Sequence, residues 1–390
     1  MKIAFVYDPI YPYVIGGAEK RYREFARELA ARGHDVSLVG MKYWQGADTL
    51  VENGVKLVGV CRAVPLYGKK GTRSVFEAVY FGVNVLLHLL KNSYDVIDCC
   101  SFPYFSALAC RAAIALRGKK ACGKFVITWL EVWGGDYWKK YSGAIWFAGC
   151  FLEKYVSSLT GNNIAISGFT AERMSLELGV SKAAIRIIPC GIDLKELKSV
   201  SSRGKIDQLI YVGRLISHKK VETLISAFAG VVSESPRFPG LKLRILGKGP
   251  SERQCRELAA SLGIADRIVF SGFVDEKELY GEIARSRIFV LPSEREGLGI
   301  VVVEAMALGT PVAALETEFS AVKNIISDGA DGVLFRDVEG LKNSIIKYLA
   351  DPAFYSKIVK AGFETAARYD TATVTAPELE EYYKNADAVC

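Results

Sequence analysis

Short apolar runs alternate with segments of helical periodicity from one end of the chain to the other. The run Lys2–Asp8 is followed by a glycine-rich loop and then by Ala18–Arg32, whose apolar side chains fall on one helical face. Gly33 stands where such a helix would end, and Val36–Val39 begins the next run. Strands that are apolar almost throughout are typical of parallel sheets covered by helices on both faces. The pattern therefore predicts a doubly wound α/β fold.

One interruption of this rhythm indicates two domains. Further strands expected before it are Val55–Val60, Asp95–Cys99, Phe125–Trp129, Asn163–Ser167 and Ile185–Pro189. The polar interval Asp193–Lys205 is interpreted as an interdomain linker. Strands expected after it are Gln208–Val212, Lys242–Leu246, Arg267–Phe270, Arg287–Leu291, Pro311–Ala314 and Gly332–Leu334. Helices expected between them are Val221–Val232, Glu252–Leu262, Glu276–Ala284, Ile300–Leu308 and Val338–Leu349.

The chain has 390 residues, which is too long for one comfortable core. We predict a Rossmann-like first domain over residues 1–195 and a Rossmann-like second domain over residues 196–369. Each would bind ligands at the carboxyl ends of its strands, and the two edges would face each other across a cleft. The last segment, 370–390, is amphipathic over Glu378–Asp387 and is expected to pack back on the first domain.

Composition excludes several other classes of protein. Half of the residues are hydrophobic and 24% are charged, which excludes a disordered chain. The longest apolar stretches, such as Val83–Leu90 and Ala144–Phe151, fall short of the roughly 20 residues that cross a bilayer. Met1 leads directly into a strand-like run, so no secretory signal is visible, and a cytoplasmic protein is expected. Nine scattered cysteines without a C-x-x-C pair, and three histidines, predict reduced core thiols and no metal site.

Charge is divided unevenly along the chain. Residues 1–200 hold 26 Lys and Arg against 17 Asp and Glu, whereas the remainder holds 24 against 26. The first half is therefore expected to meet something anionic, although a solvated basic face explains the count equally well. Peripheral contact with an anionic membrane is the partner considered, and nucleic acid is not expected because no recognition motif accompanies the charge. The cations in question are Arg111, Arg117, Lys119, Lys120, Lys124, Lys139 and Lys140.

The segment from Glu296 to Val312 is the sharpest candidate for chemistry. After the strand that ends at Leu291, Glu296 lies in a loop, and Gly297 and Gly299 open a helix that contains Glu304. Free backbone N–H groups at a helix start attract anions, and glycine lets an anion approach closely. Glu304 is placed to accept hydrogen bonds from a ribose diol. An ordinary strand-to-helix turn would explain the glycines alone.

A second motif follows the first strand of the same domain. Arg214 and Lys219 stand five residues apart, after the run that ends at Val212. An arginine at a strand end and a lysine at the next helix start can converge on one diphosphate. Each of them alone would more often be a solvated surface cation. Further turns expected at strand ends of this domain lie at Leu246–Pro250 and Ser271–Phe273.

Together these motifs resemble the retaining glycosyltransferases of family 4, which have the GT-B fold. The E-x7-E pair Glu296 and Glu304, the G-R-L-x-x-x-K element with Arg214 and Lys219, and Gly16-Gly17-Ala18-Glu19 occur in the expected order. Smaller matches are Ser167-x-x-Thr170 and the turn Pro189–Asp193. The resemblance covers essentially the whole chain.

The resemblance implies a transfer of sugar from a nucleotide-diphosphate sugar, UDP- or GDP-linked, to a glycan or lipid-linked acceptor. No other cofactor and no metal is implied, because fixed cations and a helix start can stabilise a leaving diphosphate. By resemblance, the catalytic residues are Glu296, Arg214 and Lys219. The residues implied to bind the donor are Gly16, Gly17, Arg214, Lys219, Phe273, Glu296, Leu298, Gly299, Ile300 and Glu304. Retention of configuration is also implied by the resemblance alone.

One position departs from the family. Leu130 stands at the end of the strand Phe125–Trp129, where many relatives carry histidine before an acidic residue. Glu131 and Trp133 remain as acceptor-side candidates, although Leu130 and Glu131 can equally cap a core strand and aromatic side chains are more often core. The alternatives are therefore a catalytically silent glycosyltransferase-like binding protein and, less well supported, a nucleotide-sugar epimerase or a glycan phosphorylase.

Overall fold

The computed structural model describes residues 1–68, 72–118, 123–200, 204–234 and 238–389. The chain forms two compact units, and each is described by itself. The first unit comprises Met1–Gly191 and Thr371–Cys390, and the second comprises Ile192–Asp370. The chain thus enters the second unit four residues earlier than the boundary expected at residue 195, and it returns to the first unit at Thr371.

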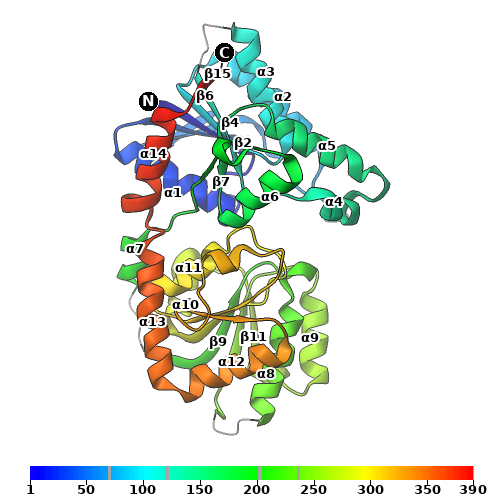
Figure 1. The fold of residues 1–390 in the computed structure, drawn as a ribbon, viewed down its shortest axis with the longest axis vertical. Helices are drawn as coiled ribbons and strands as arrows, with labels where there is room; N and C mark the ends of the chain where they lie inside the picture. Colours follow the sequence, from blue (N-terminus) through cyan, green and yellow to red (C-terminus); the bar gives the residue numbers. More distant parts are fainter. Residues whose placement is uncertain (69–71, 119–122, 201–203, 235–237, 390) are drawn as a thin grey trace. The chain divides into compact units, whose positions relative to one another are not determined.

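The first unit is built on a mostly parallel sheet with the strand order β3-β4-β2-β1-β5-β6-β7-β8 (Figure 1). Antiparallel pairing occurs between β3 and β4 and between β15 and β6. The strands are β1 (Lys2–Val6), β2 (Asp35–Lys42), β3 (Thr49–Glu52), β4 (Val55–Arg62), β5 (Val96–Cys100), β6 (Gly123–Trp129), β7 (Asn163–Ala165), β8 (Ile185–Ile187) and β15 (Ala388–Val389).

Helices cover both faces of this sheet, which explains why its central strands are apolar throughout. β1 lies between β2 and β5, with Ile3 opposite Val36 on one side and Val96 on the other. Buried side chains form separate clusters on the two faces. The helices are α1 (Gly17–Ala31), α2 (Val75–Lys91), α3 (Tyr104–Arg117), α4 (Gly134–Ser142), η2 (Gly143–Ile145), α5 (Trp146–Ser157), α6 (Gly168–Leu178), η3 (Lys182–Ala184), the π-helical turn η7 (Thr371–Thr375) and α14 (Ala376–Asn385).

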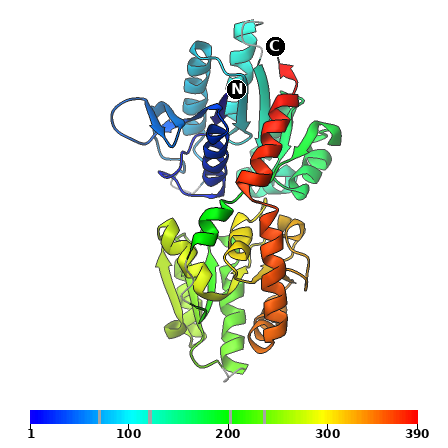
Figure 2. The same ribbon diagram turned by 90° about the vertical axis from the view of Figure 1, so that its left-hand side faces the viewer.

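The C-terminal helix α14 packs beside α1 in the first unit (Figure 2). The Tyr383 hydroxyl donates a hydrogen bond to Asp98 at 2.5 Å, and both side chains are fully buried. The Thr128 hydroxyl donates to the same carboxylate at 2.7 Å. The Lys124 ammonium donates to the carbonyl of Tyr383 at 2.6 Å, near the C-terminal end of the helix. These polar contacts fix the position of a segment that is distant in sequence.

The second unit contains a sheet whose strands are all parallel, in the order β11-β10-β9-β12-β13-β14. Counted along the chain this is the order 3-2-1-4-5-6, which is that of a Rossmann fold. The strands are β9 (Ile206–Val212), β10 (Lys242–Leu246), β11 (Ile268–Gly272), β12 (Ser286–Leu291), β13 (Val312–Leu315) and β14 (Val333–Phe335). The two central neighbours, β9 and β12, are therefore far apart in sequence.

The helices of the second unit include two that the sequence analysis missed, α7 (Leu194–Ser199) and α13 (Pro352–Ala367). Asp193 caps α7 by accepting a hydrogen bond from the Glu196 amide at 2.8 Å, and Leu197 is buried. The interpretation of Asp193–Lys205 as a linker was therefore wrong over α7, which packs against α11. The helices are α7 (Leu194–Ser199), η4 (Ser217–Lys219), α8 (Val221–Glu234), α9 (Glu252–Ser261), η5 (Ala265–Arg267), α10 (Glu276–Arg285), α11 (Ile300–Ala307), η6 (Ala321–Asn324), α12 (Val338–Ala350) and α13 (Pro352–Ala367).

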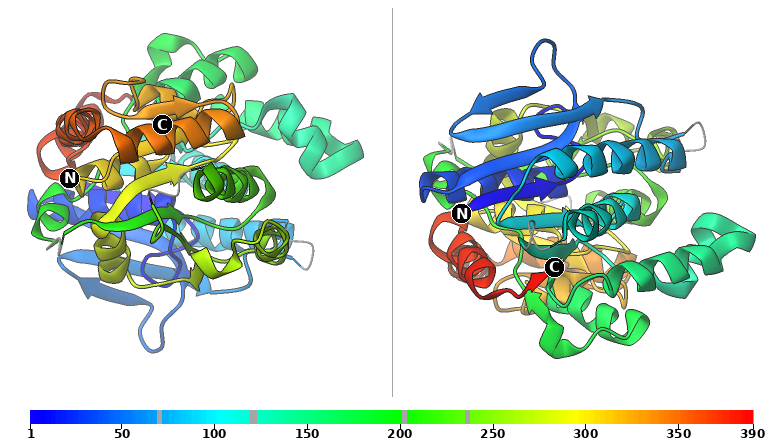
Figure 3. Two further views of the ribbon diagram at one scale, coloured as in Figure 1. Left: turned by 90° about the horizontal axis from the view of Figure 1, so that it is seen from below. Right: turned by 90° about the horizontal axis from the view of Figure 1, so that it is seen from above.

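Helices α4 and α5 project from the rest of the first unit, as both views of Figure 3 show. They are held at their base by Glu153, a fully buried carboxylate on α5. Glu153 accepts hydrogen bonds from the backbone of Trp133 at 2.8 Å and of Gly134 at 3.1 Å, where α4 begins. It also accepts from the Tyr104 hydroxyl and the Trp138 indole, each at 3.1 Å. One side chain thus joins α3, α4 and α5.

Two further properties concern membrane-spanning helices and cysteines. In the described part of the chain, no helix combines the length and the apolar character needed to cross a membrane. The seven described cysteines are free thiols, and six of them are buried.

Candidate active site

The strand order of the second unit brings the two motif segments together. Lys219 ends the turn η4 after β9, and Glu296 lies in the loop after β12. Because β9 and β12 are hydrogen-bonded neighbours, these loops leave the same edge of the sheet side by side. The Lys219 ammonium lies 2.5 Å from the Glu296 carboxylate, and both side chains are largely buried, at 16% and 14% exposure. The contact is at the point where the strand order reverses, which is where such sheets bind ligands.

Backbone hydrogen bonds hold the surrounding loops in one framework. The Glu294 amide donates to the His218 carbonyl at 2.8 Å, which joins the loop after β12 to η4. The Thr317 hydroxyl donates to the Glu294 carbonyl at 2.6 Å, and the Ala321 amide donates to the Glu296 carbonyl at 2.9 Å. Three loops, those after β9, β12 and β13, therefore position Glu296.

Glycines allow the loops after β9 and β10 to lie against each other. A Cβ at Gly247 would lie 1.9 Å from the Gly213 carbonyl oxygen, and one at Gly249 would lie 2.1 Å from the Leu215 carbonyl oxygen. Neither approach is possible for a residue with a side chain. The Leu215 amide also donates to the Lys248 carbonyl at 3.0 Å. The backbone around Arg214 is thereby fixed.

Helix α11 begins beside the Lys219–Glu296 pair. Its N-cap, Gly299, has φ 86°, in the left-handed region that favours glycine, and the helix starts at Ile300. Leu298 is buried, whereas Ile300 is half-buried. The N-cap glycine has no side chain with which to cap the helix, whose first N–H groups point back towards the loop.

Glu304 lies in the second turn of α11 and is 4% exposed. Its negative charge acts on the neighbouring Tyr280: burial raises the pKa of the Tyr280 hydroxyl well above its ordinary value, and the Glu304 carboxylate raises it further. The Tyr280 hydroxyl donates to Glu276 at 2.7 Å. Glu304 is thus a buried carboxylate on the inner side of the unit's expected ligand edge.

Two expected donor-binding residues are exposed. The Arg214 side chain is exposed after β9, and its carbonyl accepts a hydrogen bond from the Tyr211 hydroxyl at 3.0 Å. Phe273 follows β11 directly and is 64% exposed, which is unusual for a phenyl ring. Both positions are at the same carboxyl edge of the sheet as Lys219.

The glycine-rich motif of the first unit opens α1. Gly16 is the N-cap and Gly17 the first residue of the helix. A Cβ at Gly16 would lie 2.5 Å from a carboxylate oxygen of Glu19, which therefore folds back over the helix start. This carboxylate adds to the effect of burial in raising the pKa of the nearby Tyr7 well above its ordinary value. The positive end of α1 thus faces a carboxylate of its own first turn.

The acceptor-side candidates lie just past β6. Leu130 is partly buried and packs against the core cluster that includes Phe5 and Tyr22. The Glu131 carboxylate accepts a hydrogen bond from the Trp133 indole at 2.7 Å. Trp133 is 8% exposed and packs edge-on against Tyr137, with ring centroids 4.6 Å apart, so its ring belongs to the core. Among these candidates, Glu131 is the one polar side chain that is only partly buried.

Two family models match the chain over nearly its whole length. The family described as "Glycosyltransferase Family 4" matches residues 15–196, and "Glycosyl transferases group 1" matches residues 194–365. The chain belongs to glycosyltransferase family 4. The fold follows from this membership and from the two Rossmann-like units: it is GT-B.

Several proteins named as glycosyltransferases are similar in sequence. The chain is 32% identical over 203 residues to the lipopolysaccharide core biosynthesis glycosyltransferase LpsE of Rhizobium meliloti, an alignment that covers 50% of this chain and 56% of that protein. It is 24% identical over 408 residues to the MMP alpha-(1->4)-mannosyltransferase of Mycolicibacterium hassiacum, with 95% of each chain covered. The match to LpsE thus spans little more than half of that relative's length.

Solved structures share the fold over the whole chain. The sucrose-phosphate synthase of Thermosynechococcus elongatus has a TM-score of 0.76 at 22% identity, with 98% of each chain covered. HepE of Anabaena, solved with UDP and glucose, has a TM-score of 0.75 at 18% identity, with 99% of this chain and 100% of that chain covered. At these sequence identities, the similarity shows a shared fold and nothing more.

Sequence reasoning missed two features near the expected ligand edges of this family member. In the second unit, the Ser293 hydroxyl after β12 is buried without a hydrogen-bond partner in the structure. In the first unit, Asp8 follows β1, and Arg73 forms ion pairs with Asp8 and, at 3.1 Å, with Glu77. Burial raises the pKa of Glu77, while Arg73 acts in the opposite direction. Asp8 ends a strand and was readable as a strand-end carboxylate, but its partners are distant in sequence.

No group of three or more His, Cys, Asp or Glu side chains is arranged to hold a metal ion among the described residues.

Proposed function

We propose that this protein is a glycosyltransferase that moves a sugar from a nucleotide-diphosphate sugar, UDP- or GDP-linked, to a glycan or lipid-linked acceptor. The observation that carries the proposal is the Lys219–Glu296 contact of 2.5 Å at the strand-order reversal of the second unit. A cation and a carboxylate with these exposures, beside a helix start whose N-cap is glycine, form a site for a ligand with both anionic and hydroxyl groups.

In this proposal the diphosphate is held by Lys219, Arg214 and the first N–H groups of α11 after Gly299. One of the three N–H donors of Lys219 bonds Glu296, and the ammonium remains a point charge for a phosphate oxygen. The exposed Arg214 guanidinium supplies a planar fork that matches phosphate oxygens.

The same proposal assigns the neutral parts of the donor to the remaining residues. Glu296 accepts hydrogen bonds from a hydroxyl of the transferred sugar, and Glu304 accepts them from the ribose. Phe273 and the turn Leu298–Ile300 contact the base and the nucleoside. The exposed ring of Phe273 and the short reach from Glu296 to Lys219 support these roles.

Transfer would proceed by charge stabilisation. Breaking the anomeric bond leaves negative charge on the nucleoside diphosphate and positive character on the sugar ring. Lys219, Arg214 and the α11 N–H groups stabilise the former, because their charges and dipoles are already in place before the bond breaks. These fixed charges act without a metal in the proposed reaction, and the family resemblance supports retention of configuration.

The acceptor class is proposed from relatives. LpsE is named for lipopolysaccharide core biosynthesis, and a relative from Mycobacterium leprae, 30% identical over 203 residues, is a phosphatidyl-myo-inositol mannosyltransferase. We therefore place the proposed reaction in polysaccharide or cell-envelope biosynthesis, at the cytoplasmic side of the membrane. Glu131 is the proposed acceptor-side contact.

The experiment is a thermal-shift titration with UDP-, GDP-, ADP- and TDP-sugars, with and without EDTA. One nucleotide sugar should raise the melting temperature to the same extent in both buffers. Lys219→Gln should abolish this shift, whereas the control Lys220→Gln should keep it, because Lys220 is 45% exposed and contacts Glu294 instead. Equal shifts in both variants would contradict the assigned site, and loss of the shift in EDTA would contradict the metal-free reaction.

Transfer itself is tested with the donor found in that titration. Arg214→Ala should abolish transfer, and Glu304→Ala should weaken nucleotide binding. An unchanged rate or an unchanged affinity, respectively, would refute each role.

Leu130 supports the second candidate, a silent glycosyltransferase-like binding protein. A large gain of activity in Leu130→His over an inactive wild type would favour it.

A further inference from the structure

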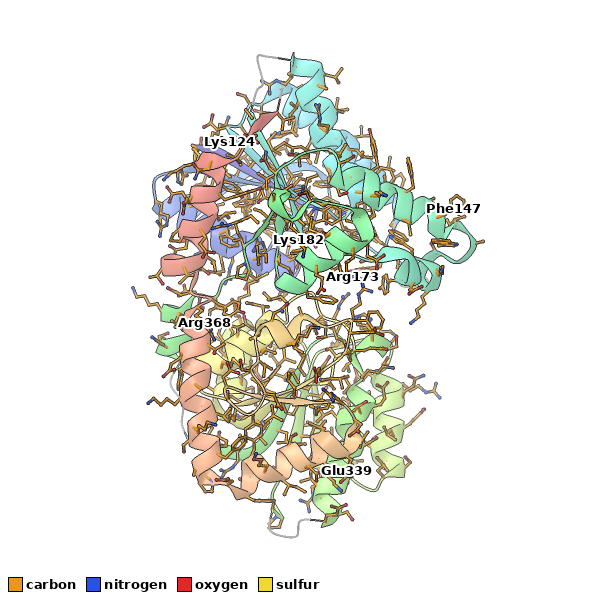
Figure 4. The ribbon with its side chains drawn as sticks, viewed as in Figure 1. Lys124, Phe147, Arg173, Lys182, Glu339 and Arg368 are labelled. Carbon is orange, nitrogen blue, oxygen red and sulfur yellow. The ribbon has the colours of Figure 1, made fainter. Side chains whose placement is uncertain are left out.

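The projecting pair α4–α5 exposes a row of large apolar side chains. Ile145 is 63% exposed, Phe147 62%, Phe151 72% and Tyr155 50%, and we name these four residues the α5 ridge. Phe147, Phe151 and Tyr155 recur every fourth residue and therefore lie along one side of α5. Phe147 lies at the far end of the projection in Figure 4. Contiguous exposed aromatic side chains mark a surface that meets an apolar partner.

The ridge is part of a rigid element. The Phe151 and Tyr155 rings stack with centroids 6.2 Å apart. The opposite side of α5 is fixed by Val156 and by Glu153, both fully buried, the latter through its four hydrogen bonds. Turning the ridge inward would require Glu153 to leave its four donors. The exposed position of the ridge is thus imposed by packing.

Charge around the ridge is predominantly positive. From Asp136 to Ser158 the exposed charged side chains are Lys139, Lys140, Lys154 and Asp136 itself. Asp136 pairs with Lys139 at 3.6 Å, and Glu153 is buried. On the neighbouring helix α6, Glu177, whose charge acts on Cys150 of α5, pairs with Arg173 at 3.3 Å. The ridge is therefore surrounded by net positive charge. Its partner should be apolar at the centre and anionic around it, as the surface of an anionic bilayer is.

We propose that the α5 ridge docks this protein on an anionic lipid bilayer, with the aromatic rings at the boundary between headgroups and acyl chains. Phenylalanine and tyrosine side chains favour that depth, and flanking lysines reach anionic headgroups. The Lys139 ammonium lies 4.9 Å from the centre of the half-buried Trp146 ring, so one lysine stem lies over the apolar surface. This inference does not depend on the proposed sugar transfer.

Part of the basic cluster expected from the sequence is not available for a membrane. Arg117 donates to the carbonyls of Leu89 at 2.8 Å and Asn92 at 2.6 Å, so its charge serves the fold. Lys124 is likewise bonded to carbonyls at the end of α14. Lys119 and Lys120 lie outside the described residues.

Helix α2 is the rival surface, because it also exposes apolar side chains. They are Val75, Phe76, Val79, Val83, Leu87 and Leu90. Over Val75–Lys91 its ionisable side chains are Glu77, which is buried, Tyr80, His88 and, at the C-terminal end, the exposed Lys91. This helix carries one exposed cation, at its end, whereas three exposed lysines lie around the α5 ridge, so the ridge is better suited to an anionic bilayer.

The test is flotation of the full chain with phosphatidylcholine vesicles that do or do not contain phosphatidylglycerol, without donor or acceptor. The wild type should bind the anionic vesicles, and added salt should weaken binding. Phe147→Asp with Phe151→Asp should lower the partition coefficient at least about tenfold, whereas Phe151→Leu should keep it. Lys139→Gln and Lys140→Gln should lower it about fivefold each.

Three outcomes would overturn the proposal. The first is that Phe147→Asp with Phe151→Asp binds vesicles as well as the wild type does. The second is that binding is lost only in the α2 variant Val79→Asp with Val83→Asp. The third is that the wild type binds no vesicles and instead forms a dimer that Phe151→Asp dissociates. The fold of each variant is checked by tryptophan fluorescence, since the ridge itself carries no tryptophan. Because nucleotide-induced thermal shifts are measured without lipid, failure of docking and failure of the proposed function give separate signals.

Discussion

Replacement of Glu153 by glutamine tests whether one buried carboxylate holds three helices of the first unit together. The carboxylate receives four hydrogen bonds, from the Trp133 and Gly134 amides, the Tyr104 hydroxyl and the Trp138 indole. An amide offers one acceptor oxygen, so two donors must face its NH2 group. In the better orientation the oxygen keeps Gly134 and Trp138, and the Tyr104 hydroxyl turns to accept. The Trp133 amide is then left without an acceptor.

The magnitude follows from these contacts. A buried donor without an acceptor costs about 1–3 kcal/mol, and each retained bond loses about 1 kcal/mol when its acceptor is no longer charged. Burial raises the pKa of Glu153 in spite of the donors, so ionisation in the folded state costs free energy that glutamine avoids. We therefore expect the free energy of unfolding to fall by about 2–3 kcal/mol.

The assay is urea unfolding followed by tryptophan fluorescence. All five tryptophans of the chain lie in the first unit, so the signal reports on that unit alone. Glu172→Gln makes the same chemical change at an exposed position of α6 and should alter stability by less than about 0.5 kcal/mol. A Glu153→Gln variant that unfolds within the same 0.5 kcal/mol of wild type would refute the reasoning.

Three further changes test other parts of the fold. Tyr383→Phe removes the hydroxyl that donates to the buried Asp98 and should destabilise the first unit by about 1.5–3 kcal/mol in the same fluorescence assay; a smaller effect than 0.5 kcal/mol would mean that α14 is held otherwise. Gly249→Ala forces a methyl group onto the Leu215 carbonyl and should lower the free energy of unfolding of the second unit by about 2 kcal/mol or more, as measured by calorimetry. In the control Gly240→Ala the added methyl group meets nothing within 4 Å, so this change should be nearly neutral. Equal effects of the two substitutions would contradict the close approach. Burial lowers the pKa of Lys205 from 10.5 to about 8, so between these pH values the unfolded state binds more protons than the folded state. The stability of the second unit should therefore rise with pH over this range, by on the order of 3 kcal/mol. The rise should vanish in Lys205→Met, and its persistence there would refute the assignment.

Sequence periodicity was sufficient to predict most of the second unit. Its strands are apolar and its helices amphipathic, so β9 to β14 and the helices between them begin and end close to the predicted residues. The prediction was wrong at Asp193–Lys205, where polar composition concealed a helix of six residues, α7, whose one buried leucine is too little to show a period. Short helices that depend on capping and a single contact leave little trace in a hydrophobicity pattern.

The first unit was harder to predict because some of its helices do not follow the usual rule that exposed faces are polar. Val83–Leu90 belongs to α2 and Ala144–Phe151 spans η2 and α5. The first stretch is apolar except for Asn84 and His88, and the second is apolar throughout. In the structure Val83 and Phe147 are more than half exposed. Without one polar face, neither periodicity nor burial can be inferred from sequence. The surface that we propose for docking is therefore the part of the chain that a pattern analysis describes least well.

The candidate site shows a different limit of sequence reasoning. The types of residue needed for an anion and for hydroxyl groups were evident at Arg214, Lys219, Glu296 and Glu304, but their proximity was not, because Lys219 and Glu296 are 77 residues apart. The order 3-2-1-4-5-6 resolves this, since it makes β9 and β12 neighbours and directs the loop after each strand to the same place. A sheet that continued in sequence order would place β10 beside β9 on that side and separate the two side chains. The contact therefore depends on the reversal of strand order, and any change that shifts the register of β12 against β9 should disrupt the Lys219–Glu296 pair before it unfolds the unit.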